Sequence, residues 1–235
     1  KCIELAYELD TGIHIHISET EKEVRDCLDE HGKTPVAYLD ELGLFGLPTL
    51  AAHCVHLEDS DIDILEKRGV SIVHCPYSNL KLASGFMPAA ELVGGGMNIC
   101  LGTDGASSNN NLSIIKEMQL AAVLGKAVAR DAAVLPATYI LRMATINGAR
   151  ALNWEEEIGS IEVGKKADIV LIDNSGPHYM PQNDATALLA YSSHSSDVDT
   201  VIVDGNILME DGKLQTIDLD RACFEVERIR RRIMQ

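Results

Sequence analysis

Four residues combine the types and positions needed for metal-assisted chemistry. They are His16, Glu19, His53 and Asp104. His16, His53 and Asp104 each end or closely follow a short apolar run, and Asp104 lies in the glycine turn Leu101–Gly105. Imidazole nitrogens and carboxylate oxygens are the usual protein ligands of a divalent metal that activates water. The pattern therefore predicts a hydrolytic metal site.

The spacing of His16 and Glu19 indicates a different role for each of them at the predicted site. They are three residues apart at the end of an apolar run, so the histidine can bind a metal while the carboxylate, beyond the strand tip, reaches a metal-bound water. Asp104 follows the apolar run 97–101, and in barrel enzymes the carboxyl ends of strands carry the catalytic groups. A metal or proton-transfer role for Asp104 is predicted on this basis.

His14, close to His16, and His56, close to His53, are alternative metal ligands. His14 and His16 have the H-x-H form in which two side chains on one face of a strand bind the same metal. His53 and His56 are three residues apart, so a regular strand cannot direct both into one pocket. We choose His53 because it directly ends its apolar run.

Short apolar runs alternate with amphipathic segments up to about residue 150, which is typical of β/α units around a parallel sheet. Strands are predicted near 13–17, 50–55, 70–75 and 98–102, and helices near 20–31, 34–43, 58–68, 88–95, 111–130 and 135–146. A closed (β/α)₈ barrel needs eight strands, and Lys1 already lies within a helical pattern. We expect residues 1–154 to be the second half of such a barrel.

The pattern changes after Trp154. A glycine turn followed by a buried strand is predicted within 158–173, and a hairpin is predicted around the turn pair Asp204-Gly205. Residues 155–217 are therefore assigned to a β-sandwich portion. Residues 218–235 are assigned to an amphipathic helix, whose terminal arginines we interpret as a solvated, dipole-favoured helix end.

Charge and composition exclude several classes of partner. The chain has 36 acidic and 20 basic residues and a formal net charge of −16, which disfavours binding to nucleic acid or anionic membranes. No apolar run approaches the roughly 20 residues of a membrane span. The six cysteines form no C-x-x-C pair, which favours reduced thiols. We expect a cytoplasmic homo-oligomer acting on a small molecule.

Other catalytic motifs are missing from the sequence. It has no G-x-S-x-G nucleophile elbow, no phosphate-binding G-x-x-x-x-G-K-[ST] loop, and no H-x-E with P-C-x-x-C of the small zinc deaminases. The glycine run 94–96 precedes a strand and does not open a helix, so a phosphate-binding role is not expected for it.

Five segments together resemble the amidohydrolase superfamily, and within it the 5-methylthioadenosine/S-adenosylhomocysteine deaminases and related chlorohydrolases. They are His14–Thr20, Ala51–Leu57, His74–Leu82, Leu101–Gly105 and Gly164–Val170. The resemblance implies a (β/α)₈ barrel with one divalent metal, usually zinc, and a β-sandwich built from both ends of the chain.

The resemblance also implies roles for individual residues. His16 matches the metal-binding histidine of strand five, and Asp104 matches the strand-eight aspartate that contacts the metal and activates water. Glu19 matches the carboxylate that shuttles protons, and His53 matches the strand-six histidine beside the bound water. Glu19 and Asp104 are also expected to contact the substrate. His14 then lies on strand five and is not part of the family's first-strand H-x-H.

The implied reaction is zinc-dependent hydrolytic deamination of an adenine nucleoside thioether, with release of ammonia. The family's first-strand H-x-H and the substrate-binding residues of strands two to four have no counterpart in this sequence. Two alternatives remain. One is a related amidohydrolase that acts on a triazine, guanine or another amine-bearing ring, and the other is a non-catalytic fragment that folds only with a partner supplying the missing half.

Overall fold

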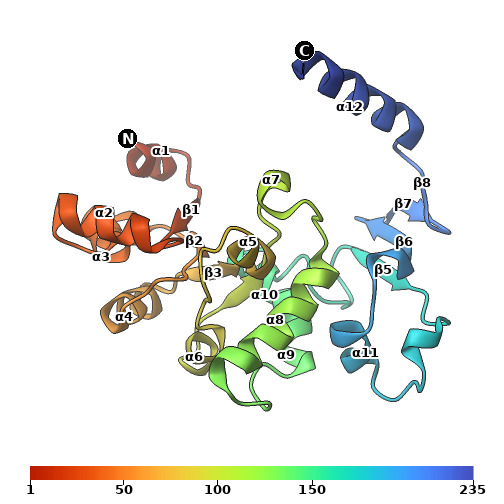
Figure 1. Ribbon diagram of the computed structural model, residues 1–235, viewed down its shortest axis with the longest axis horizontal. Coiled ribbons are helices and arrows are strands. Elements are labelled where there is room, and N and C mark those ends of the chain that lie inside the picture. Colours follow the sequence, from red (N-terminus) through yellow and green to blue (C-terminus); the bar gives the residue numbers. More distant parts are fainter. Residues whose placement is uncertain (235) are drawn as a thin grey trace.

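A four-stranded parallel sheet organises the first part of the chain (Figure 1). The computed structural model describes residues 1–234. The strands are β1 (Ile13–Ile17), β2 (Thr49–His53), β3 (Ser71–His74) and β4 (Ile99–Leu101), hydrogen-bonded in that order. The four predicted strands are confirmed, although β2 and β3 end slightly earlier than expected. All four strands present their carboxyl ends at the same edge of the sheet.

Helices precede, connect and follow the strands, and most of them pack on one face of the sheet, whereas α10 (Ile146–Ala151) contributes to the opposite face (Figure 1). They are α1 (Cys2–Glu8), α2 (Glu21–His31), α3 (Pro35–Glu41), α4 (Asp59–Arg68), α5 (Pro76–Lys81), α6 (Ala89–Gly94), α7 (Ala106–Asn109), α8 (Ile114–Ala129), α9 (Ala137–Met143) and α10 (Ile146–Ala151), with a 3₁₀ turn at Leu44–Gly46. Thr20 and Thr34 cap α2 and α3 by accepting a backbone N–H, as threonine does at helix starts. The mixed α/β class is confirmed.

Two of the predicted helices differ from the structure. The helix expected near 135–146 is α9, which ends already at Met143, and the separate helix α10 begins at Ile146, because Thr145 has φ −133° and ψ −101°, outside the helical range. The helix expected near 111–130 begins only at Ile114. The side chain of Asn109 accepts the backbone N–H groups of Asn111 and Leu112 and holds that stretch in a turn.

The two faces of the parallel sheet have different surroundings. Ile15, Ala51, Ile72 and Ile99 are register partners and pack in the main core beneath the helices. The opposite face carries the row His16, Ala52, Val73 and Cys100. The last three of that row are buried with Cys75 and Ala151 of α10 in a smaller cluster. His16 is thus the polar end of an otherwise apolar row.

Leu65 of α4 tests the main core, because its side chain is fully buried at 0% exposure. Leu65→Ala in the full-length protein should lower the free energy of unfolding by about 2–5 kcal/mol, the sum of lost burial and a residual cavity. Urea unfolding measures it. Leu42→Ala is the control, since Leu42 is 51% exposed and a surface change costs within about 0.5 kcal/mol. Equal losses in the two variants would contradict this packing.

A second, antiparallel sheet follows the parallel one (Figure 1). It comprises β5 (Ile169–Ile172), β6 (Val198–Val203), β7 (Asn206–Glu210) and β8 (Lys213–Leu214) in that order, and α11 (Ala185–Tyr191) precedes β6. The predicted hairpin is confirmed at β6–β7. Asp204 and Gly205 both have positive φ, as a two-residue turn of type I′ requires.

The prediction of a buried strand within 158–173 is confirmed for the strand but is wrong about its burial. It forms β5, but Val170 and Leu171 are 54% and 49% exposed. The reason is that β5 is an edge strand, paired only with β6. An apolar run predicts that a strand forms, but burial also depends on a covering element that the run cannot specify.

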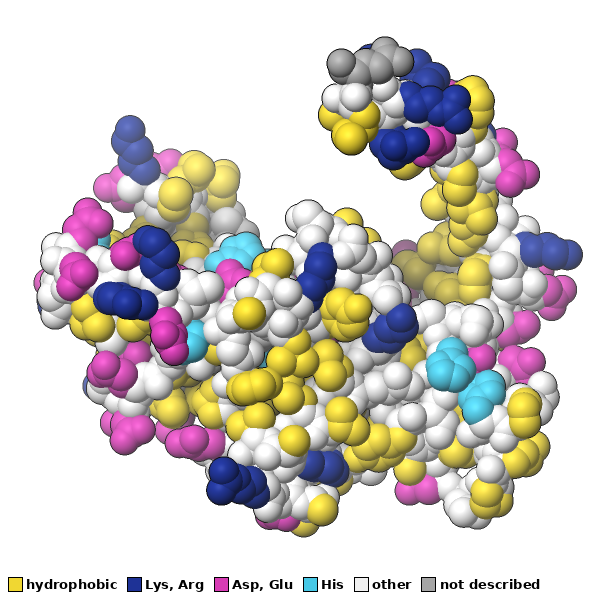
Figure 2. All heavy atoms as spheres, viewed as in Figure 1, with side chains coloured by type: hydrophobic (Ala, Val, Ile, Leu, Met, Phe, Trp, Pro, Cys, Tyr) yellow, Lys and Arg dark blue, Asp and Glu magenta, His cyan; other side chains and the backbone are white. Residues whose placement is uncertain are grey.

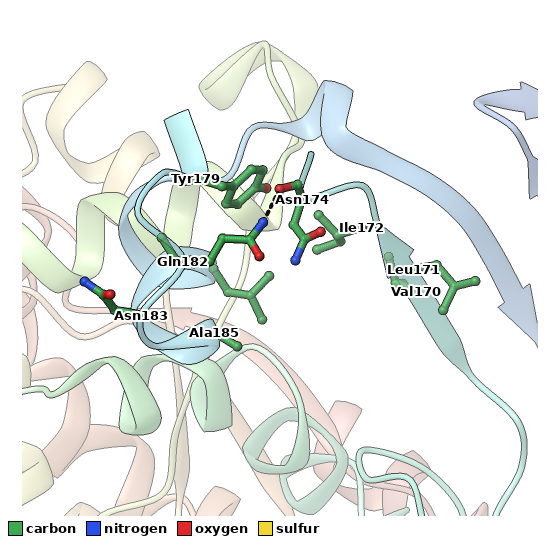
Figure 3. A pocket seen from close by; sticks show the side chains of 10 residues that line it. Val170, Leu171, Ile172, Asn174, Tyr179, Gln182, Asn183 and Ala185 are labelled. Carbon is green, nitrogen blue, oxygen red and sulfur yellow. Dashed lines mark hydrogen bonds between the residues drawn. The ribbon is translucent and has the colours of Figure 1, made fainter. Parts of the chain in front are cut away.

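A cavity of about 420 Å³ lies between β5 and α11 (Figure 3). Its lining is largely aliphatic, with the amides of Asn174, Gln182 and Asn183, and Gln182 donates a hydrogen bond to the backbone oxygen of Asn174. The hydroxyl of Tyr179 is used elsewhere, because it lies 2.9 Å from both the Ser193 hydroxyl and the Asp197 carboxylate and hydrogen-bonds with them. The lining residues include no histidine or carboxylate, so this cavity is not the hydrolytic site.

Helix α12 (Leu219–Ile233) extends away from the two sheets (Figure 1). Asp218 caps it by accepting the N–H of Arg221. Figure 2 shows basic side chains gathered near its free end beside apolar ones. Arg228 pairs with Glu225, and Arg230 pairs with Glu227. None of the helices within residues 1–234 is both long and apolar enough to cross a membrane.

Candidate metal centre

His16, His53 and Asp104 come together at the carboxyl edge of the parallel sheet. One ligand atom from each lies within 4.8 Å of the others. In the described part of the chain, residues 1–234, these three residues form the group of His, Cys, Asp or Glu side chains whose ligand atoms lie close enough to share one metal ion. Two imidazoles and a carboxylate form a donor set typical of a catalytic zinc, which keeps a further position for water. The residues present fit a zinc ion.

The position of His53 depends on an unusual backbone conformation. His16 is aligned with Ala52 and Ile17 with His53, so a regular strand would direct the His53 ring to the helix-covered face. His53 instead has φ +74°, and its ring stacks beside that of His16 with centroids 5.1 Å apart. A histidine in the left-handed region is uncommon, and such strain is concentrated at functional sites.

His53 has a polar neighbour at each ring nitrogen. Its side chain is almost completely buried, and Nδ1 lies 2.8 Å from Oδ1 of Asn79. Nε2 lies 3.7 Å from Oε2 of Glu19. The ring is therefore placed between an amide that fixes it and a carboxylate that faces the site.

Asp104 also has a positive φ, of 60°, in the turn after β4. Its Oδ2 accepts a hydrogen bond of 2.6 Å from the Ser78 hydroxyl, and its Oδ1 accepts one of 2.6 Å from the Gly105 N–H. Burial alone would raise the pKa of this carboxyl, but these hydrogen bonds and nearby His53 outweigh it and leave the pKa below its ordinary value. The carboxylate is thus ionised at neutral pH, as a metal ligand must be.

Glu19 lies just beyond the strand that carries His16, as its spacing predicts. The N–H groups of Ser18 and Glu19 donate to the carboxylate of Glu23 on α2, each at 2.7 Å. The Glu19 side chain is partly exposed, and its Oε1 accepts a hydrogen bond of 3.0 Å from Ser84. Glu19 is thus positioned with one carboxylate oxygen held and the other directed toward His53.

His14 and His56, the alternative ligands that the sequence allows, lie outside the group formed by His16, His53 and Asp104. His14 shares a strand face with His16, but their ring centroids are 6.4 Å apart and the ligand atoms grouped with His16 come from His53 and Asp104. Burial, followed by the nearby His16 and His53, lowers the pKa of His14. His56 is turned to the backbone oxygen of Ser84. The ligand atom of His16 is therefore grouped with those of His53 and Asp104, and not with that of His14.

Sequence reasoning assigned no function to Ser78, Asn79, Ser84 or His74. The first three contact the candidate residues, and the signal that could have found Ser78 and Asn79 was the adjacent Ser-Asn pair within segment 74–82. His74 ends β3 in a fully buried position. Burial, and to a smaller degree His53, lowers the pKa of His74 to about 3 and keeps its ring neutral.

The cysteines near the site are chemically inactive. All six are free, and Cys54, Cys75 and Cys100 are buried. Burial raises the pKa of the Cys75 thiol to about 12 and that of the Cys100 thiol to about 11. A thiol is a nucleophile only as its thiolate, so neither cysteine is a candidate nucleophile at neutral pH.

Comparison with known proteins places this geometry in a family. The model of the amidohydrolase family matches residues 1–208. A 5-methylthioadenosine/S-adenosylhomocysteine deaminase of Caldanaerobacter subterraneus is 54% identical over 226 residues, which cover 96% of this chain and 52% of that protein. The chain spans about half the length of the curated relatives it matches.

Solved structures agree with this placement. The crystal structure of an adenosine deaminase from Xanthomonas campestris with bound zinc superposes with a TM-score of 0.95 at 42% identity, covering 98% of this chain and 53% of that one. A zinc complex of an atrazine chlorohydrolase from Arthrobacter aurescens has a TM-score of 0.88 at 26% identity, covering 95% and 49%. On the evidence of the sequence match and of the fold, the chain belongs to the amidohydrolase family.

Proposed function

We propose that this chain is the C-terminal portion of a zinc-dependent aminohydrolase that deaminates 5′-methylthioadenosine or S-adenosylhomocysteine. The observation that carries the proposal is the convergence of His16, His53 and Asp104 beside Glu19, in a chain 54% identical to a deaminase of that name. Water adds at C6 of the adenine, the exocyclic amine leaves as ammonia, and the inosine analogue remains.

In this proposal His16 and Asp104 hold the metal, together with ligands from outside this chain. Zinc, when bound, lowers the pKa of a water molecule from 15.7 to about 7. Asp104 takes the proton of the attacking water. Its low pKa suits a carboxylate that starts the reaction ionised.

Two further side chains, Glu19 and His53, complete the proposed site. Glu19 delivers a proton to the purine ring nitrogen next to C6, which makes that carbon a better acceptor of the attacking oxygen. His53 orients the attacking oxygen through Nε2, the nitrogen that faces the site. Glu19 and Asp104 would then contact the substrate as well as move protons.

The same proposal interprets the architecture. Strands β1–β4 would be strands five to eight of a (β/α)₈ barrel over residues 1–154, and residues 155–217 would be part of a β-sandwich. Residues 218–235 would be the terminal segment that contains α12, with residue 235 outside the described residues. The parallel order β1-β2-β3-β4 supports this, as does a match to about half of a zinc-bound deaminase.

A direct assay tests the reaction. Purified full-length protein loaded with zinc is given 5′-methylthioadenosine, S-adenosylhomocysteine, guanine and a chlorotriazine in parallel, and ammonia and chloride are measured. Ammonia from either adenine nucleoside, at a higher kcat/KM than from guanine, is the expected result. Chloride release from the triazine, or faster turnover of guanine, would replace the proposed substrate with one of the alternatives.

The unpaired sheet edges lead to a prediction about the 235-residue chain alone. Among the described strands β1 pairs only with β2, and β4 pairs only with β3. Exposed edges and the apolar side chains of α12 favour association with other chains. We expect self-association, with less than one zinc per chain because ligands are missing. Light scattering combined with zinc quantification measures both properties, and a monodisperse monomer with stoichiometric zinc would contradict the prediction.

A further inference from the structure

Three buried polar side chains lie close together on α5 and the turn that follows it. They are Ser78, Asn79 and Ser84, which are 0%, 1% and 6% exposed. Each contacts a different residue of the candidate site. The pairs are Ser78 Oγ with Asp104 Oδ2 at 2.6 Å, Asn79 Oδ1 with His53 Nδ1 at 2.8 Å, and Ser84 Oγ with Glu19 Oε1 at 3.0 Å. A single segment of seven residues thus contacts Asp104, His53 and Glu19, the three residues to which the proposed function gives a catalytic role.

We propose that the segment 78–84 positions the catalytic side chains, and that Asn79 is the positioning residue that fixes the tautomer of His53. The kinetic part of this inference rests on the proposed function. The tautomer part does not, because it concerns the ring of His53 in the resting protein.

The chemistry of the Asn79 contact explains why it decides the tautomer. An amide oxygen only accepts hydrogen bonds, so Nδ1 of His53 must carry the proton. In the neutral ring Nε2 then carries the lone pair, on the side that faces Glu19. Because His53 is 1% exposed, water does not compete to set the tautomer. Without the acceptor, the proton can move to Nε2 and block the lone pair that the site needs.

The segment is itself held rigidly. The N–H of Tyr77, near the start of α5, donates to Oε2 of Glu117 at 3.1 Å, and Glu117 is buried within α8. Oε1 of Glu117 accepts from Asn109, which also donates to the backbone oxygen of Thr103 at 2.6 Å. The buried carboxylate of Glu117 therefore connects the start of α5, through Asn109, to the loop that carries Asp104. These hydrogen bonds hold the segment in position relative to that loop.

The tautomer is measured by NMR on metal-free, full-length protein with ¹⁵N-labelled histidine, in which two-bond couplings identify the protonated nitrogen. In the unaltered protein His53 should carry its proton on Nδ1. Asn79→Leu has nearly the same shape but no acceptor, and His53 should shift toward the Nε2-protonated form. Asn79→Asp retains an acceptor and should restore the Nδ1–H signal.

A matched control separates positioning from general loss of stability. Asn147 is also buried, at 3% exposure, and donates to the backbone oxygen of Ile99. Asn147→Leu should destabilise the protein but leave the His53 tautomer unchanged. If Asn79→Leu does not fold, Asn79→Ala is measured instead, since it leaves space in place of the amide.

Turnover provides the second readout. Asn79→Leu should lower kcat about 10–100-fold, the usual effect of losing a residue that orients a site histidine, with KM changed by less than about twofold. Asn79→Asp should recover part of the loss. An unchanged Nδ1–H signal in Asn79→Leu would overturn the inference even if the protein is a deaminase. If the unaltered protein deaminates neither adenine nucleoside, the proposed function fails while the NMR result still decides the role of Asn79.

Discussion

Replacing Glu19 by glutamine is expected to lower deaminase turnover by about a hundredfold or more while the zinc content stays the same, because a positioned proton-transfer group contributes 10²–10⁴-fold. Glutamine keeps the shape of Glu19 and its contact with the Ser84 hydroxyl. It cannot supply a proton to the purine ring. Steady-state kinetics with 5′-methylthioadenosine and metal analysis of the same sample provide the test.

Glu21→Gln is the control for this experiment. Glu21 is exposed at the start of α2, two residues from Glu19, and removing its charge changes the local electrostatics without touching the site. Its turnover should be close to that of the unaltered protein. Full turnover in Glu19→Gln would show that the Glu19 carboxylate only accepts the Ser84 hydrogen bond and moves no proton.

Removing either proposed ligand should have the second large effect. His16→Ala and Asp104→Ala should each weaken zinc binding by more than about a hundredfold, since residues that merely orient a ligand already contribute about 10–100-fold. Turnover should fall with the zinc content. Competition with a chelator of known zinc affinity measures the binding in full-length protein, independently of any substrate.

His14→Ala is the matched control, because His14 lies two residues from His16 on the same strand face. It should retain zinc, since its ring is outside the group formed by His16, His53 and Asp104. Loss of zinc in His14→Ala together with full zinc content in Asp104→Ala would contradict the assignment of Asp104 as a ligand. It would support a site in which His14 and His16 bind the same metal.

Much of the fold could be predicted because it depends on local patterns. The apolar runs at β1–β4 are short and separated by amphipathic segments, and the Asp204-Gly205 turn is specific for a hairpin. The errors come from interactions that a run of residues does not contain. Thr145 breaks a helical pattern through its backbone angles, and β5 remains exposed at a sheet edge.

Residue types and spacing were enough to predict which residues could form the site and at which edge of the sheet they lie. His16, His53 and Asp104 follow strands that run in parallel, and parallel strands in register bring their carboxyl ends together. Glu19 follows His16 at a spacing that keeps it near the same edge.

The directions of these side chains and the contacts that hold them depend on the folded chain and could not be predicted from residue types and spacing. The φ of +74° at His53 turns its ring toward His16, and a torsion at one residue is not visible in a pattern of residue types. The contacts from segment 78–84 join residues 26 and 65 positions apart. Such contacts depend on where packing places α5 above the ends of the strands, because the energy that holds a side chain in one direction comes from its neighbours in space.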